Sequence, residues 1–162
     1  MGDYNHNQDS RWKFWKEVVE QNLLLPAVNL ESLSMTCGMG SAPPIDYNLL
    51  AYPRLTALSL GNIIWVIRVA PSGSTKGEML PEVENFVVRH GKTLKKLELR
   101  NCAMAVLRDS TVRRSGAAIW TRFANELTKL VDLVLYKPWN AGTDDVLALG
   151  TFKTIVEARK SN

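Results

Sequence analysis

The sequence is poor in the residues that usually carry chemistry. Its 162 residues include two cysteines and two histidines, and none of these lies at the spacing that zinc ligands require. A nucleophile, a base and an orienting group cannot be assembled from the chain into a catalytic set. We therefore expect no enzymatic activity, no metal and no cofactor.

The best candidate for a nucleophile and its base is Cys37 or Cys102 with His90. His90 stands where a predicted helix ends, and the helix dipole favours a cation there, so its position is explained without catalysis. The two cysteines are expected about 9–10 Å apart, at about 4.8 Å per strand. A disulfide needs Cα atoms closer than about 7 Å, so we expect free, buried thiols.

Long apolar runs and targeting signals are also absent. No stretch approaches the roughly 20 apolar residues of a membrane span. The opening letters MGDYNHNQDSRWK lack the basic head and apolar core of a secretory signal. We expect no contact with a membrane, a cytoplasmic or nuclear location, and a flexible segment over residues 1–9.

The excess of positive charge is small. The net charge is +4, which is compatible with nucleic-acid binding but argues for it only weakly. The basic residues gather between Arg89 and Arg114, without the interleaved aromatic rings on which single-stranded nucleic acid would stack. A basic nucleic-acid-binding domain is the alternative function, and it would use Arg89, Lys92, Lys95, Arg113 and Arg114.

What the sequence does contain is a leucine pattern that occurs four times. The spacing Leu-x-x-Leu-x-Leu is present in LTALSL, LKKLEL and LVDLVL, and LESLSM is a close variant. The intervals between the copies are irregular. The copies predict four short strands, near residues 30–36, 55–61, 94–100 and 130–136.

Helical segments precede three of the four copies. The clearest is LPEVENFVVRHG, in which Pro81 suits the first turn and Gly91 can close the helix. Its buried face is predicted to be Val83, Phe86, Val87 and His90. Ser115 can cap a second helix, with the apolar stripe Ile119, Trp120, Phe123, Ala124 and Leu127. Ser10 can cap a third, with Trp12, Trp15 and Val19 on one side.

A repeated unit of helix, turn and strand predicts a parallel sheet, because parallel neighbours need a crossover of a dozen or more residues. We expect an α/β fold: a short leucine-rich-repeat-like solenoid with parallel strands on one face and helices on the other, in a single domain over residues 10–162. Residues 69–78 and 137–145 are predicted loops. The sequence leaves 143–160 open: Thr143 can cap a helix with Asp144 and Asp145 in its first turn, or VLALGTF can form an edge strand.

The stretch FVVRHGKTLKKLELRNCAM, Phe86 to Met104, resembles the repeat unit of fungal F-box and leucine-rich-repeat proteins. There, a helix ending in an RHG-T-L turn leads into L-x-L-x-C. LTALSLGNI and FANELTKLVDLVLYK are similar to looser copies, and the resemblance covers roughly residues 23–137. It implies that the repeats hold a protein target for a ubiquitin ligase. An F-box, a helical segment of some forty residues opening with Leu-Pro, is not found, since Leu25-Pro26 leads directly into the first strand copy.

In the repeat pattern the spaced leucines point into the core and the residues between them point outward. The expected outward residues are Ser32, Ser34, Thr36, Ala57, Ser59, Gly61, Lys96, Glu98, Arg100, Asp132, Val134 and Tyr136. A rigid surface of this kind suits recognition of a protein partner. We predict that the charged end of this surface binds the partner and that Trp139 is an exposed anchor beside it. The predicted binding residues are Lys96, Glu98, Arg100, Asp132, Tyr136 and Trp139.

Overall fold

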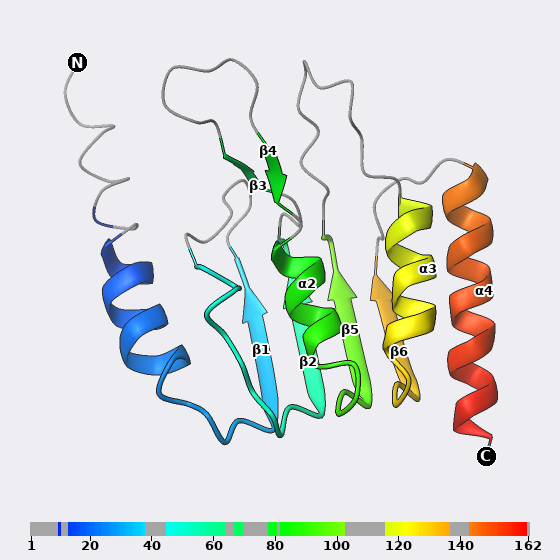
Figure 1. The fold of residues 1–162 in the computed structure, drawn as a ribbon, viewed down its shortest axis with the longest axis horizontal. Coiled ribbons are helices and arrows are strands. Elements are labelled where there is room, and N and C mark those ends of the chain that lie inside the picture. The colour runs from blue at the N-terminus through cyan, green and yellow to red at the C-terminus, as the bar shows by residue number, and fades with distance from the viewer. Residues whose placement is uncertain are drawn as a thin grey trace.

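The fold is built on a four-stranded parallel sheet. The computed structural model describes residues 10, 13–37, 45–63, 67–69, 78–80, 82–102, 116–136 and 143–161. The strands are β1 (Ser32–Thr36), β2 (Ala57–Gly61), β5 (Lys96–Arg100) and β6 (Asp132–Tyr136), in the order β1-β2-β5-β6 (Figure 1). Each lies within one of the four leucine copies. The prediction of an α/β fold with parallel strands is therefore confirmed.

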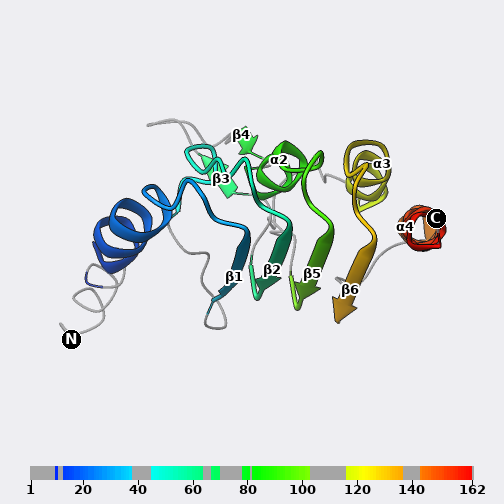
Figure 2. The same ribbon diagram turned by 90° about the horizontal axis from the view of Figure 1, so that it is seen from below.

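Helices lie on one face of this sheet and beside both of its edges (Figure 2). They are η1 (Phe14–Leu24), α2 (Glu82–Arg89), α3 (Gly116–Glu126) and α4 (Thr143–Lys160). Figure 2 shows α2 and α3 on one side of the strands, η1 beyond the β1 edge and α4 beyond the β6 edge. The opposite face carries no helix among the described residues. Each described helix is also too short or too polar to span a bilayer.

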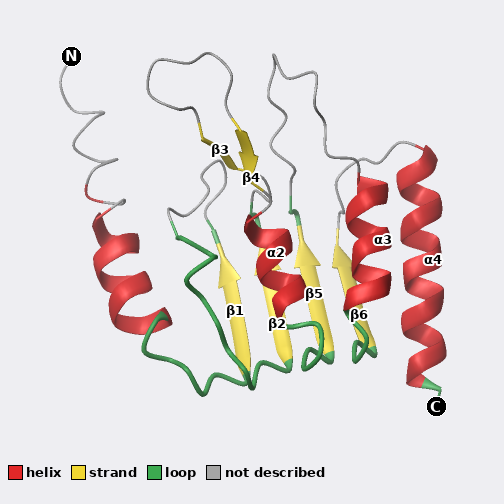
Figure 3. Cartoon of the chain, viewed as in Figure 1, coloured by secondary structure: helices red, strands yellow, loops and turns green. Residues whose placement is uncertain are grey.

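The segment that the sequence left open is a helix. Residues 143–160 form α4, with Asp144 and Asp145 in its first turn, so the alternative of an edge strand is wrong (Figure 3). A second difference lies in the predicted loop 69–78. Its ends belong to a small antiparallel pair, β3 (Ile67–Val69) and β4 (Glu78–Leu80), which the sequence did not predict.

The core lies between the sheet and the helices. Register places the leucines in rows across the strands: Leu33, Leu58, Leu97 and Leu133, then Met35, Leu60, Leu99 and Leu135. The side chains of these rows are buried on β1, β2 and β5 but only half-buried on β6, the last strand of the sheet. The predicted helix faces pack on them, with Val83, Phe86, Val87, Ile119, Trp120 and Phe123 all buried.

The backbone enters each successive strand in the same way. The carbonyl of Glu31 accepts the N–H groups of residues 56 and 57 at the start of β2. The carbonyl of Thr56 accepts those of residues 95 and 96 at the start of β5, and the carbonyl of Lys95 accepts those of residues 131 and 132 at the start of β6. Asn62 and Asn101 follow β2 and β5 with φ of 54° and 47°. The chain therefore repeats its hydrogen bonding as well as its leucines.

The N-terminal helix is anchored by a buried carboxylate. Glu20, on η1, accepts hydrogen bonds from Lys16 Nζ and from the backbone N–H of Asp46, at 3.0 and 2.6 Å. The helix is wound in π form, and the Leu25 N–H donates to the carbonyl of Glu20, five residues earlier. Trp15 and Val19 pack against the core as their spacing predicts, while Trp12 lies outside the described residues.

His90 is not the cation that its place at a helix end suggested. The ring is buried, Nδ1 donates to the Phe86 carbonyl at 2.7 Å, and Nε2 accepts the Tyr52 N–H at 3.0 Å. An acceptor nitrogen must be unprotonated, so the imidazole is neutral. Burial is the main cause that lowers the pKa of His90. The hydrogen bond to Phe86 opposes this shift, and the charge of Arg89 adds a smaller lowering effect.

The two cysteines are free and buried, as expected. Cys37 follows β1 and Cys102 follows β5, with β2 between them. The Cys102 thiol donates to the Leu60 carbonyl at 3.4 Å. Burial raises the pKa of the Cys37 thiol, and the nearby Cys102 adds to the effect, so Cys37 favours the neutral thiol.

Candidate binding face of the sheet

The face of the sheet without helices presents three rows of side chains, which we call the open face. Parallel pairing in register sets these rows, because alternate residues of a strand point to the same side. The first row is Ser32, Ala57, Lys96 and Asp132; the second is Ser34, Ser59, Glu98 and Val134; the third is Thr36, Gly61, Arg100 and Tyr136. All twelve positions are those that the leucine spacing predicted.

Eleven of these positions reach solvent at least in part, and one does not. Gly61 is buried because the Thr36 side chain lies over it; a Cβ at Gly61 would stand 2.8 Å from Thr36 Oγ1. The expectation that Gly61 lines the surface is therefore wrong. Glycine lets the Thr36 side chain lie flat on β2, so the hydroxyl end of the open face is closely packed.

Charges concentrate on β5 and at the start of β6. Lys96 Nζ lies 3.8 Å from Asp132 Oδ2, joining the two strands, and the Arg100 guanidinium is hydrogen bonded to Glu98 on the same strand. Lys96, Asp132 and Arg100 are about half exposed or more, whereas the Glu98 side chain is only 13% exposed. The solvent-exposed Lys96–Asp132 pair contributes at most about 1 kcal/mol. The main effect of the two pairs is to fix alternating charges on the surface.

The apolar part of the open face lies on β6. Tyr136 is 54% exposed and Val134 is 38% exposed, and both point to the same side of β6. Neighbouring aromatic and aliphatic surface of this kind is typical of binding anchors. Trp139, the other predicted anchor, lies outside the described residues.

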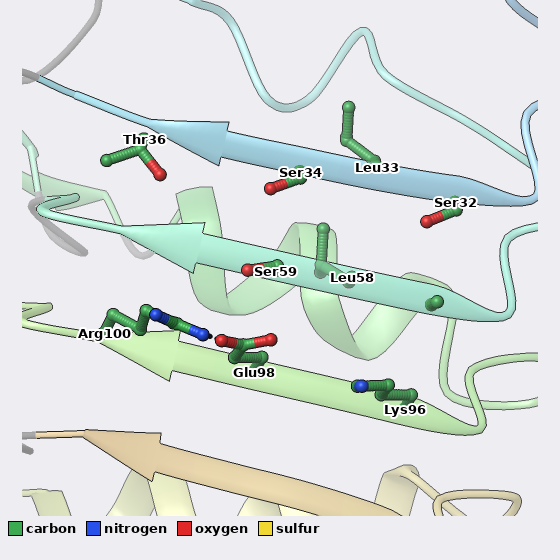
Figure 4. Close-up of a pocket in the computed structure, with 10 residues that line it drawn as sticks. Ser32, Leu33, Ser34, Thr36, Leu58, Ser59, Lys96, Glu98 and Arg100 are labelled. Atoms are coloured by element: carbon green, nitrogen blue, oxygen red, sulfur yellow. Dashed lines mark hydrogen bonds and ion pairs between the residues drawn. The ribbon is translucent and has the colours of Figure 1, made fainter.

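A hollow of about 490 Å³ lies between the hydroxyl and charged parts of the open face. Figure 4 shows the Ser32, Ser34 and Ser59 hydroxyls of β1 and β2 on one side and the charged side chains of β5 on the other. The lining offers hydrogen-bond donors and acceptors. No cluster of three or more metal-ligating side chains occurs within the described part of the chain. The hollow can therefore hold polar groups of a partner.

Three of the five basic residues of the alternative function, Arg89, Lys92 and Lys95, lie in the described structure. Arg89 Nη1 donates to the carbonyls of Asn48 and Leu50, at 3.0 and 2.7 Å, so its charge supports the segment before β2. Lys92 and Lys95 are exposed in the turn after α2. Arg113 and Arg114 lie outside the described residues.

Sequence reasoning missed one further feature, a groove beside β6. It is lined by β6 and by Lys153, Val156, Glu157 and Lys160 of α4. The helical spacing of these four residues was readable in the sequence. The groove was not, because residues 143–160 could be read as helix or as strand.

Comparison with protein-family models, with curated proteins and with solved structures gives no match in any of the three.

Proposed function

We propose that this chain is a short leucine-rich-repeat-like module that binds a protein partner on the open face and carries out no catalysis. The observation that carries the proposal is the three in-register rows on a face without helices, with balanced charges beside an exposed tyrosine. The repeated hydrogen bonding at the strand starts supports the repeat architecture.

Binding on such a face depends on complementarity with a rigid surface. The backbone of the four strands is held by its ladders, so little order is lost when a partner docks. A partner would place an anion near Lys96 and Arg100, a cation near Glu98 and Asp132, and an apolar group against Tyr136. Exposed charges set orientation and association rate, and the tyrosine supplies buried area.

The partner proposed from the sequence resemblance is a target protein of a ubiquitin ligase. In that role the open face would hold the target while another part of the assembly recruits the ligase. A rigid face that recognises alternating charges suits selection among targets, because a like charge at any of the four sites opposes binding.

The test is a charge reversal on the open face. The partner is first identified by crosslinking and then purified. Lys96→Glu/Arg100→Glu is expected to weaken binding of this partner at least tenfold, as measured by calorimetric titration. Lys92→Glu/Lys129→Glu makes the same charge change on exposed residues in turns and serves as the matched control. Unchanged affinity of the first variant would exclude the open face as the binding surface.

A salt series separates protein binding from the alternative. A domain that contacts several phosphates loses nucleic-acid affinity by about 10³-fold or more between 50 and 200 mM salt. We expect no tight, strongly salt-dependent binding to RNA or DNA. Such binding would favour the basic nucleic-acid-binding domain instead.

A further inference from the structure

The outer edge of β6 offers backbone groups for one more strand. In its ladder with β5, the Asp132 N–H donates to the Lys95 carbonyl and the Tyr136 carbonyl accepts the Asn101 N–H. Backbone groups of successive residues point to opposite edges of a strand. Those of Leu133 and Leu135 therefore face away from β5, and no strand pairs with them within the described residues.

A groove of about 440 Å³ follows this edge. Its walls are β6 from Val131 to Leu135 and the α4 residues Lys153, Val156, Glu157 and Lys160. Leu133 and Leu135 are half-buried, whereas the equivalent leucines of β2 and β5 are buried. Within the described part of the chain no strand covers the outer sides of these leucines. The groove is apolar at its base and charged at its helical rim.

The helix layer extends one element further than the strand layer. α4 lies parallel to α3: Asp145 accepts the Ala117 N–H at the start of α3, and Arg159 donates to the carbonyls of Ala124 and Leu127 at its end. Phe152 stacks on Trp120, with ring centroids 6.0 Å apart. In Figure 2, α4 follows α3 while no described strand follows β6. No described strand therefore lies beside β6, and the groove between β6 and α4 follows its outer edge.

We infer that an extended peptide segment of another protein docks in this groove and pairs with the outer edge of β6. Its backbone meets Leu133 and Leu135, and its alternate apolar side chains rest on those leucines and on Val156. Lys153 and Lys160 have no ion pair among the described residues and outnumber Glu157 on the same wall, which favours acidic side chains at most of the remaining positions of the peptide. The groove shares Asp132 and Val134 with the open face, but the edge backbone of Leu133 and Leu135 and the α4 lysines belong to the groove alone.

A second copy of the chain fits less well than a peptide. Stacking its β1 against β6 would bring its η1 towards the place that α4 occupies, because η1 flanks β1 as α4 flanks β6 (Figure 2). A single extended segment has no such attachment. Its width matches the strand spacing of about 4.8 Å.

Gly150 extends the lysine stripe of α4 by one turn beyond the residues that line the groove. It lies three residues before Lys153, on the same stripe of α4, and a Cβ there would meet nothing within 4 Å. Glycine inside a helix is about 1 kcal/mol less favourable than alanine. The fold therefore does not require glycine at this position, whereas a passing backbone would benefit from it.

The test begins with selection of binders from a displayed library of random octapeptides. We expect the enriched peptides to share apolar residues at alternate positions with acidic residues between them. One enriched peptide, made synthetically, should slow amide hydrogen exchange of Leu133 and Leu135 at least tenfold. Methylation of its alternate backbone nitrogens should weaken binding at least tenfold, because the ladder bonds are lost.

Variants locate the site and separate it from the open face. Lys153→Glu/Lys160→Glu should weaken binding of the peptide at least tenfold. The affinity of Lys92→Glu/Lys129→Glu and of the open-face variant Lys96→Glu/Arg100→Glu for the peptide should stay within twofold of the wild-type value. Gly150→Ala should raise the melting temperature and still weaken the peptide, a combination that a folding defect cannot produce.

Three results would overturn the inference. They are failure to enrich any peptide, equal binding of the methylated peptide, and protection of Leu133 and Leu135 that rises with protein concentration in the absence of peptide. The last result would mean that a second copy of the chain occupies the edge. Failure of the open-face variants would affect only the proposed function.

Discussion

A single histidine connects two parts of the core that are far apart in sequence. His90, at the end of α2, accepts a hydrogen bond from the N–H of Tyr52, 38 residues earlier, and its ring stacks on the Tyr52 ring at 5.9 Å between centroids. Its other nitrogen donates to Phe86. Both hydrogen bonds need the neutral form with the proton on Nδ1.

Because His90 is held neutral, acid should destabilise the fold. Burial lowers the folded-state pKa of His90, so below the unfolded pKa of about 6.5 the unfolded chain binds a proton that the folded chain does not. The free energy of unfolding should therefore be full above that pH and fall as the pH drops below it, by at most about 1.4 kcal/mol per pH unit. Urea unfolding between about pH 5 and about pH 7.5 measures it.

The matched variant is His90→Gln, whose amide does not titrate. It should be less stable than the wild type at about pH 7.5 and should lose part of the pH dependence in that window. An unchanged slope would mean that other groups titrate there and that His90 does not sense the pH.

The sequence led to a wrong prediction of the charge of His90. The helix dipole argument placed a cation at the end of α2 and was correct about the helix. It could not include Tyr52, because no local spacing connects residue 52 to residue 90. A hydrogen bond from a distant backbone N–H then decides the protonation state against the dipole.

Elements with a complete periodic pattern were predictable. The four strands, α2 and α3 follow from leucine spacing and from helical apolar stripes. The secondary structure of residues 143–160 could not be decided from the sequence, because Gly150 and the run VLALG fit both a helix and a strand. Tertiary contacts decide for the helix: Asp145 and Arg159 bond to opposite ends of α3, with charges of the sign that each end favours.

α2 and α3 are joined by an ion pair with one buried partner. Glu84 is 1% exposed, and Arg122 Nη1 donates to its Oε1 and to the Asn85 Oδ1, both at 2.8 Å. The guanidinium is one-third exposed and so stays partly hydrated. A buried carboxylate needs such a partner, since an unpaired charge in the interior is strongly unfavourable.

Arg122→Met should therefore destabilise the fold by about 3 kcal/mol, because it leaves the Glu84 carboxylate buried without its cation. The double variant Arg122→Met/Glu84→Leu should recover most of that loss, since it removes the charge as well as its partner. Urea unfolding of the two variants gives both values. A loss under about 1 kcal/mol for Arg122→Met would show that the pair contributes little.

At the scale of the whole molecule, the open face was predictable and the groove was not. Strand alternation determines which side chains share a face once the leucines are assigned to the core. It therefore predicted eleven of the twelve positions correctly, and Gly61 failed because a neighbouring strand covers it. The groove depends on how α4 packs beside β6, which no single stretch of sequence encodes.

The proposed repeat architecture would be stabilised mainly by contacts between neighbouring units. The strands pair only with the next strand in order, and α4 packs on α3. Damage at one end should then loosen that end first. Phe152 is the best place to test this, because it is fully buried on α4 and contacts Trp120 and Phe123 of α3.

Phe152→Ala should reduce the free energy of unfolding by about 3–4 kcal/mol through the cavity that it leaves. By nearest-neighbour coupling, amide hydrogen exchange should accelerate most in α3, α4 and β6 and least in β1. The comparison is Leu58→Ala in β2, a buried site in the middle of the sheet, which should accelerate exchange on both sides of it. If Phe152→Ala loosens β1 as much as β6, the molecule unfolds as one cooperative unit and the neighbour-by-neighbour description is wrong.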